Sequence, residues 1–114
     1  IRVKSWWDFK PVNILRDQFY GDWEGMHATP SEISITQNTH RIVRIDDLAP
    51  PEKLSPDYIA AHAGDKHGPP GEHRKSFPDG RVGSHSGLAK VEHGEKLLNA
   101  AARAVAEDYA SFVQ

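Results

Sequence analysis

The sequence predicts an α/β fold with a mainly parallel sheet, because a strand pattern, a capped helix and a second strand pattern follow one another. Residues 1–7 alternate with the period of two that a half-buried strand shows. Thr29, Pro30 and Glu32 carry the start signals of a helix, which we expect over residues 30–38. Residues 41–45 are rich in β-branched side chains and predict the next strand. A strand, a helix and a strand in this order are typical of a parallel crossover unit.

The other elements are predicted from the positions of Gly and Pro and from the spacing of apolar residues. Pro11 opens a short helix or turn that reaches Phe19, and an irregular loop with Trp23 follows between Gly21 and Gly25. Residues 46–88 form a long Pro- and Gly-rich excursion with one helical turn near residues 56–63, and such connections are usually functional or held by something outside the chain. An amphipathic helix closes the chain, with Lys96 and Arg103 opposite these apolar residues: Val91, Leu97, Leu98, Ala101, Val105, Tyr109 and Phe112.

At 114 residues the chain has the length of one domain or a piece of one. Two parallel strands need cover on both faces and are marginal alone, so the predicted sheet is incomplete. We expect the missing surface to come from an oligomer partner or from sequence absent here. The first residue is Ile1 rather than Met, which agrees with a chain that begins inside a longer protein.

Composition excludes several classes of function. The 14 Lys and Arg against 16 Asp and Glu give a net charge of -2, which argues against a nucleic-acid partner. Without Cys there is no disulfide, no thiolate zinc site and no cysteine nucleophile. No targeting segment or membrane span is visible, so we expect a cytoplasmic protein with no membrane partner. Phosphate loops and nucleophile elbows are also missing, so phosphoryl transfer and serine hydrolysis are not indicated.

Histidine is frequent, and five of the seven histidines lie in or beside the excursion: His62, His67, His73, His85 and His93. None has the spacing that places two metal ligands on one helical face. One hypothesis is a loop metal site built from His67, His73 and His85. The alternative is that these are solvated loop residues.

Four residues are candidates for a site. His27 precedes a helix start, where free N–H groups and the helix dipole favour a neutral imidazole that can act as a base. Glu32 either orients His27 and helps bind substrate or completes a capping box with Thr29. Trp7 and Trp23 are either core residues or the walls of a pocket for a small planar ligand. A position beyond the carboxyl ends of parallel strands favours the pocket.

Three stretches resemble the carboxyl-terminal half of the creatininase (creatinine amidohydrolase) family. They are Ser5-Trp6-Trp7-Asp8-Phe9, then Gly21-Asp22-Trp23-Glu24-Gly25-Met26-His27-Ala28 with Glu32 and Ser34, and Gly83-Ser84-His85-Ser86-Gly87-Leu88-Ala89-Lys90-Val91-Glu92-His93-Gly94-Glu95-Lys96-Leu97-Leu98. The resemblance covers nearly the whole chain and is weakest in the proline-rich middle. It implies that residues 1–114 are the carboxyl-terminal portion of one domain, a layered α/β/α sandwich.

The same resemblance implies a metal-dependent amidohydrolase that opens a cyclic amide or cleaves a related C–N bond. It implies that Trp7 and Trp23 wall the substrate site, that His27 is the acid/base, and that Glu32 is the acidic residue that opens the following helix. Two divalent ions, Zn²⁺ or Mn²⁺, belong to the complete enzyme and polarise the carbonyl and generate hydroxide.

The family's metal-ligand motifs belong to the half that precedes residue 1, and none is present here. We therefore expect a missing amino-terminal half to supply the metals, the isolated chain to be inactive, and the whole to form a homo-oligomer. Met26 replaces a family Glu, and His85-Ser86 replaces Asp-Pro, which argues against creatinine as the small-molecule amide substrate. The alternative function is a non-catalytic small-molecule-binding or assembly module that lacks the metal-binding half.

Overall fold

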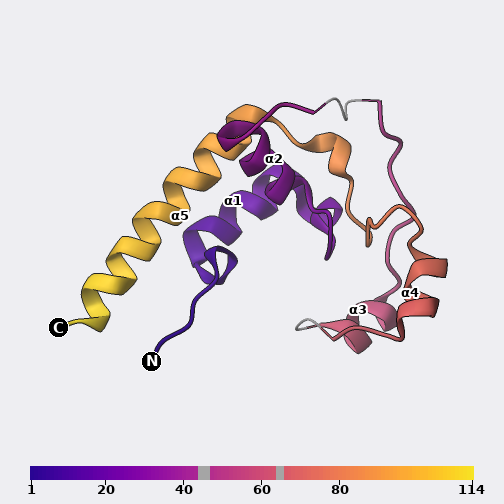
Figure 1. The fold of residues 1–114 in the computed structure, drawn as a ribbon, viewed down its shortest axis with the longest axis horizontal. Helices are drawn as coiled ribbons and strands as arrows, with labels where there is room; N and C mark the ends of the chain where they lie inside the picture. The colour runs from indigo at the N-terminus through magenta and orange to yellow at the C-terminus, as the bar shows by residue number, and fades with distance from the viewer. Residues whose placement is uncertain (44–46, 64–65) are drawn as a thin grey trace.

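A computed structural model describes residues 1–43, 47–63 and 66–114. The long helix α5 runs beside α1 and α2, whereas α3 and α4 lie apart from these three at the end of irregular connections (Figure 1). The two termini lie near each other, and Arg2 forms an ion pair with Asp108 at 3.1 Å. The elements follow in chain order, with α for an α-helix and η for a 3-10 helix. They are η1 (Trp6–Asp8), α1 (Lys10–Tyr20), η2 (Gly21–Glu24), α2 (Pro30–Thr39), α3 (Pro56–His62), α4 (Pro70–Ser76), η3 (Ser86–Leu88) and α5 (Val91–Phe112).

The predicted α/β fold is wrong, because the described residues are helical and contain no strand. Ile1 and Val3 of the first predicted strand are 117% and 85% exposed and have no regular structure. The Ser5 N–H donates to Asp8 Oδ2 at 2.7 Å, which turns the chain into η1. An alternating pattern forms a strand only when a neighbour pairs with it, and a local capping bond competes here.

The second predicted strand fails in the same way. Ile42 and Val43 are 72% and 46% exposed and have no regular structure, and residues 44 and 45 lie outside the described residues. The sandwich with a parallel sheet, and the crossover unit on which it depended, are therefore withdrawn.

The helix predictions are confirmed for α1, α2, α3 and α5. Helix α4 was not predicted, because Pro69-Pro70-Gly71 suggests a loop. Pro70 stands at the first position of the helix, where its missing N–H costs nothing.

The core lies where α1, α2 and α5 meet. Val12 and Tyr20 of α1 are buried together with Leu97 and Ala101 of α5. Gly94 permits this meeting, because a Cβ built there would overlap the carbonyl group of Ser34, 2.5 Å from its carbon. The backbones of α2 and α5 therefore approach each other more closely than any side chain at position 94 allows.

Only one of the two apolar seams of α5 is buried. Leu97, Ala101 and Ala104 face the core, whereas Leu98, Val105, Tyr109 and Phe112 remain 38% to 66% exposed. The predicted single apolar face of this helix is thus two adjacent seams. The second stays partly exposed, although the Arg2 guanidinium lies 4.8 Å from the centre of the Phe112 ring.

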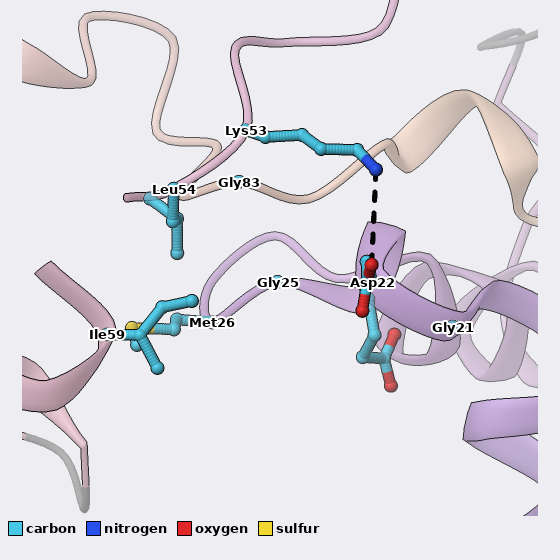
Figure 2. Close-up of a pocket in the computed structure, with 9 residues that line it drawn as sticks. Gly21, Asp22, Gly25, Met26, Lys53, Leu54, Ile59 and Gly83 are labelled. Carbon is cyan, nitrogen blue, oxygen red and sulfur yellow. Dashed lines mark ion pairs between the residues drawn. The ribbon is translucent and has the colours of Figure 1, made fainter. Parts of the chain in front are cut away.

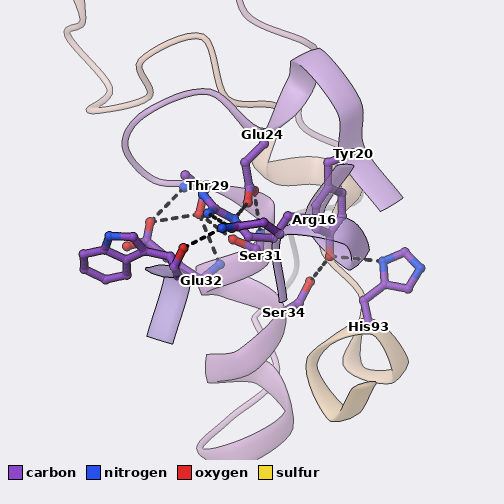
Figure 3. Close-up of polar contacts among 10 residues, drawn as sticks. Arg16, Tyr20, Glu24, Thr29, Ser31, Glu32, Ser34 and His93 are labelled. Atoms are coloured by element: carbon purple, nitrogen blue, oxygen red, sulfur yellow. Dashed lines mark hydrogen bonds and ion pairs between the residues drawn. The ribbon is translucent and has the colours of Figure 1, made fainter. Parts of the chain in front are cut away.

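A polar network ties the same three helices together (Figure 3). The hydroxyls of Tyr20 and Ser34 lie 2.7 Å apart, and His93 Nδ1 lies 3.1 Å from the Tyr20 hydroxyl. The Ser34 hydroxyl also accepts the Lys90 N–H at 3.0 Å, and the His93 ring stacks on Phe19 with centroids 4.0 Å apart. Burial raises the pKa of Tyr20 to about 12, so this hydroxyl stays protonated.

We predict that Gly94→Ala destabilises the protein by about 3 kcal/mol, because the new methyl group forces two packed helix backbones apart. Gly71→Ala in α4 is the matched control. A Cβ there meets nothing within 4 Å, and alanine favours a helix by about 1 kcal/mol. Urea unfolding of both variants measures the difference, and equal stabilities would contradict the close approach of α2 and α5.

We also predict that stability falls as the pH drops from about 7 through 6.5. Burial, followed by the charges of Lys90 and Lys96, holds the pKa of His93 below its ordinary 6.5. The unfolded chain therefore binds the proton more readily than the folded protein does, and the free energy of unfolding decreases until the folded residue is also protonated. His93→Gln, which does not titrate, should reduce this dependence, whereas the exposed His40→Gln should preserve it. Unfolding curves recorded at several pH values give the free energy of unfolding as a function of pH. If this free energy changes equally with pH in the wild type and in both variants, His93 is not the residue responsible.

Candidate functional site

The loop that carries His27 is held by backbone pairing with residues 82–86. The Met26 N–H donates to the Val82 carbonyl at 2.9 Å, and the Val82 N–H donates to the His27 carbonyl at 3.3 Å. The Ser84 hydroxyl also donates to the His27 carbonyl, and the Ser86 hydroxyl donates to that of Ala28 at 2.7 Å. Two of the sequence stretches that carry the family resemblance thus lie against each other.

The pairing requires a special backbone on either side of His27. Gly25 has a φ of +63°, and a Cβ there would lie 2.5 Å from the Ser84 nitrogen. Ala28 has a φ of 53°, a left-handed conformation that costs an L-residue about 1–2 kcal/mol. The loop is therefore strained next to His27, and the bonds to residues 82–86 hold it in this conformation.

Two adjoining cavities lie beside this loop. The first, here the Glu32 cavity, measures about 200 Å³ and contains three of the four predicted site residues, Trp7, His27 and Glu32. The second, here the His67 cavity, measures about 310 Å³ and extends to α3. Four residues line both cavities: Trp7, Arg16, Met26 and His27.

Trp23, the fourth predicted site residue, lines neither cavity. Its ring lies under Lys53 Nζ at 4.9 Å and meets the edge of His85 at 5.7 Å. A third cavity of about 350 Å³ opens near it, where Lys53 reaches toward Asp22 at 4.0 Å and Leu54 covers Gly83 (Figure 2).

Glu32 forms the capping box that was one of its two predicted roles. Its Oε2 accepts the Thr29 N–H at 3.1 Å and the Thr29 hydroxyl at 3.0 Å, while the Glu32 N–H donates to Thr29 Oγ1 at 3.2 Å. Because the side chain also lines a cavity and is exposed, capping does not remove it from reach of a ligand.

An ion pair between Arg16 and Glu24, which no sequence pattern predicted, lies beside the site (Figure 3). Glu24 is only 8% exposed, and its Oε1 accepts the Ser31 N–H at 3.1 Å. The Arg16 Nε donates to Glu24, its Nη1 donates to Asn13 at 2.8 Å, and its guanidinium lies 5.6 Å from the Trp6 ring. Glu24 is the last residue of the short 3-10 helix η2, where no periodicity in the sequence marks it as buried.

We predict that Glu24→Gln destabilises the protein by about 2–3 kcal/mol, because it removes the charge opposite a half-buried guanidinium. Asp22→Asn is the control. Asp22 pairs with Lys53 on the surface, where such pairs contribute less than about 1 kcal/mol. Chemical denaturation compares the two, and a loss no larger for Glu24→Gln than for the control would contradict the role of the pair.

The histidines are grouped differently from the predicted loop metal site. His67 and His73 have ring centroids 6.5 Å apart, but His27 joins them at 5.1 Å and 6.4 Å, whereas His85 packs on Trp23. No three His, Asp or Glu side chains in the described ranges form a group that could hold a metal ion. In the part of the chain that the structure describes, His67, His73 and His85 are therefore not gathered into one group.

No protein family has a sequence profile that matches this chain, and no curated protein matches it either. Within the described residues, no helix combines the length and the apolar character needed to cross a membrane.

Proposed function

We propose that this chain is the carboxyl-terminal part of a creatininase-like, metal-dependent amidohydrolase that acts in the cytoplasm on a cyclic amide or a related C–N bond. The observation that supports the proposal is the gathering of Trp7, His27 and Glu32 around one cavity. These residues come from η1, from the strained loop and from the first turn of α2.

Each residue has a role that its surroundings support. The indole of Trp7 offers a flat apolar wall for a planar amide. His27 is the general acid/base that moves a proton at the scissile C–N bond, and Glu32, which lines the same cavity, binds polar substrate atoms. Trp23 lies outside the cavity, so we assign the wall to Trp7 alone.

The described residues do not fit a metal centre, because no three potential ligands are gathered. We assign the ligands of the two divalent ions, Zn²⁺ or Mn²⁺, to the missing amino-terminal half.

The second candidate, a non-catalytic assembly module, is favoured by the partly exposed apolar seam of α5. Its apolar residues follow one another at intervals of four, three, four and three, as in a two-stranded coiled coil: Leu98, Ala102, Val105, Tyr109 and Phe112. A second copy of this chain offers the same seam, which also supports a homo-oligomer for the amidohydrolase.

We predict that His27→Asn lowers turnover of the complete enzyme by about 10²–10⁴-fold and leaves its metal content unchanged, because the variant removes a proton-transfer group only. Trp7→Ala should mainly raise KM. The exposed His40→Asn, at the end of α2, is the matched control and should retain both turnover and metal.

Activity assays with metal analysis on the same samples test this prediction. Parallel losses of turnover and metal in His27→Asn would exclude the acid/base role. A native protein that is metal-free and self-associates through α5 would instead support the assembly module.

A further inference from the structure

We propose that the third cavity, here the Leu54 cavity, is a second binding site, which takes a small uncharged molecule with an aliphatic group. It measures about 350 Å³, within the range of about 300 to 1,000 Å³ that small-molecule sites have. The proposal goes beyond the proposed function and does not depend on it. The residues assigned to the amidohydrolase, Trp7, His27 and Glu32, line another cavity.

One side of the Leu54 cavity is apolar. Met26 of the loop with His27, Leu54 of the segment before α3, and Ile59 of α3 lie on this side (Figure 2). The Ile59 side chain is 47% exposed, and Met26 and Leu54 are only half-buried. An aliphatic group that covers these three side chains removes apolar surface from water on both molecules, and this favours binding.

Two of these apolar side chains belong to segments that the fold holds in place. Leu54 packs against the backbone of Gly83, because a Cβ built on that glycine would lie 2.5 Å from Leu54 Cγ. The Met26 N–H donates to the Val82 carbonyl at 2.9 Å, which fixes the backbone of the opposite segment. A cavity whose walls are formed before the ligand arrives loses less conformational entropy on binding.

The charged side chains of the Leu54 cavity all have partners. Lys53 Nζ lies 4.0 Å from Asp22 and 4.9 Å from the centre of the Trp23 ring. Glu24 is 8% exposed and forms its ion pair with Arg16. An ion of either sign gains little net attraction here, yet it loses hydration when it enters the cavity. The cavity therefore suits an uncharged ligand.

Met26 makes binding in this cavity measurable. It is the only methionine of residues 1–114, and its flexible side chain adapts its shape to an apolar ligand. Met26 also lines the Glu32 and His67 cavities, so a signal from its methyl group reports a ligand in any of the three. The experiment therefore needs probes that distinguish ligand classes and variants that distinguish the cavities.

The test compares three probes by NMR titration of the complete protein with ¹³C-labelled methionine methyl groups. The Met26 resonance is identified by its absence in Met26→Leu. Isovaleramide and acetamide share the amide and differ by an isopropyl group, so isovaleramide should bind at least about tenfold more tightly. Isovalerate has the aliphatic group of isovaleramide together with a negative charge, and it should bind more weakly than isovaleramide.

Variants locate the preference for isovaleramide in the Leu54 cavity. Ile59→Asn should remove most of this preference, because it replaces part of the apolar side with an amide. Ala60→Asn introduces the same residue at an exposed position of the same helix outside the cavity, and it should leave the preference intact. Equal affinities for isovaleramide and acetamide, tighter binding of isovalerate, or equal effects of the two variants would overturn the proposal. Binding is measured without turnover, so the outcome is independent of the His27→Asn assay.

Discussion

The contact between Gly94 of α5 and the Ser34 carbonyl of α2 is the constraint on which the site depends. The loop with His27 leads directly into α2, and residues 82–86 lead through η3 into α5. Because the two helices pack together at this point, the loop with His27 and residues 82–86 lie beside each other. Their backbone groups then pair, and the buried hydroxyls of Ser84 and Ser86 bind the carbonyls of His27 and Ala28. The packing of α2 against α5 thus sets the conformation of the irregular loop that carries His27.

Arg16 connects this packing to the chemistry of the site. Its position on α1 lets one side of the guanidinium bind Glu24, which in turn accepts the first-turn N–H of Ser31. The free backbone N–H groups in the first turn of α2 therefore find acceptors in two places, at Glu24 and in the capping box of Thr29 and Glu32. Arg16 lines both cavities, so the guanidinium that satisfies the buried Glu24 carboxylate is also part of the site.

What the sequence predicted well was local. Both helix signals involve residues one turn apart: Thr29 and Glu32 form the capping box of α2, and Leu97 and Ala101 follow the helical period of α5. Helices α2 and α5 were therefore predicted with nearly correct bounds. The strands at residues 1–7 and 41–45 depended on partners far along the chain, and alternation alone does not supply them.

In the candidate site, too, some features could be predicted from the sequence, whereas others depend on segments that are distant along the chain. Trp7, His27 and Glu32 were named from the sequence and line one cavity, but the approach of residues 82–86 was not foreseen. Trp23 was placed with them because its loop leads to His27 and was expected beyond the carboxyl ends of the predicted parallel strands. The 3-10 turn η2 instead directs its ring toward Lys53 and His85. Glu24, one residue further on, is buried by the same turn, and no pattern in the sequence distinguishes these two neighbours.

The two cavities differ in what stabilises their walls. The Glu32 cavity is built on η1, α1 and α2, whose helices join the buried core. The outer wall of the His67 cavity includes Tyr58 and His62 of α3 and His67, which precedes α4, and neither helix contains a buried residue. That region is held by ring contacts such as those between Tyr58 and Phe77 and between His27 and His67. Local opening requires the least free energy where few apolar groups are buried, so a ligand reaches His27 at lower cost through this wall than through the helical core.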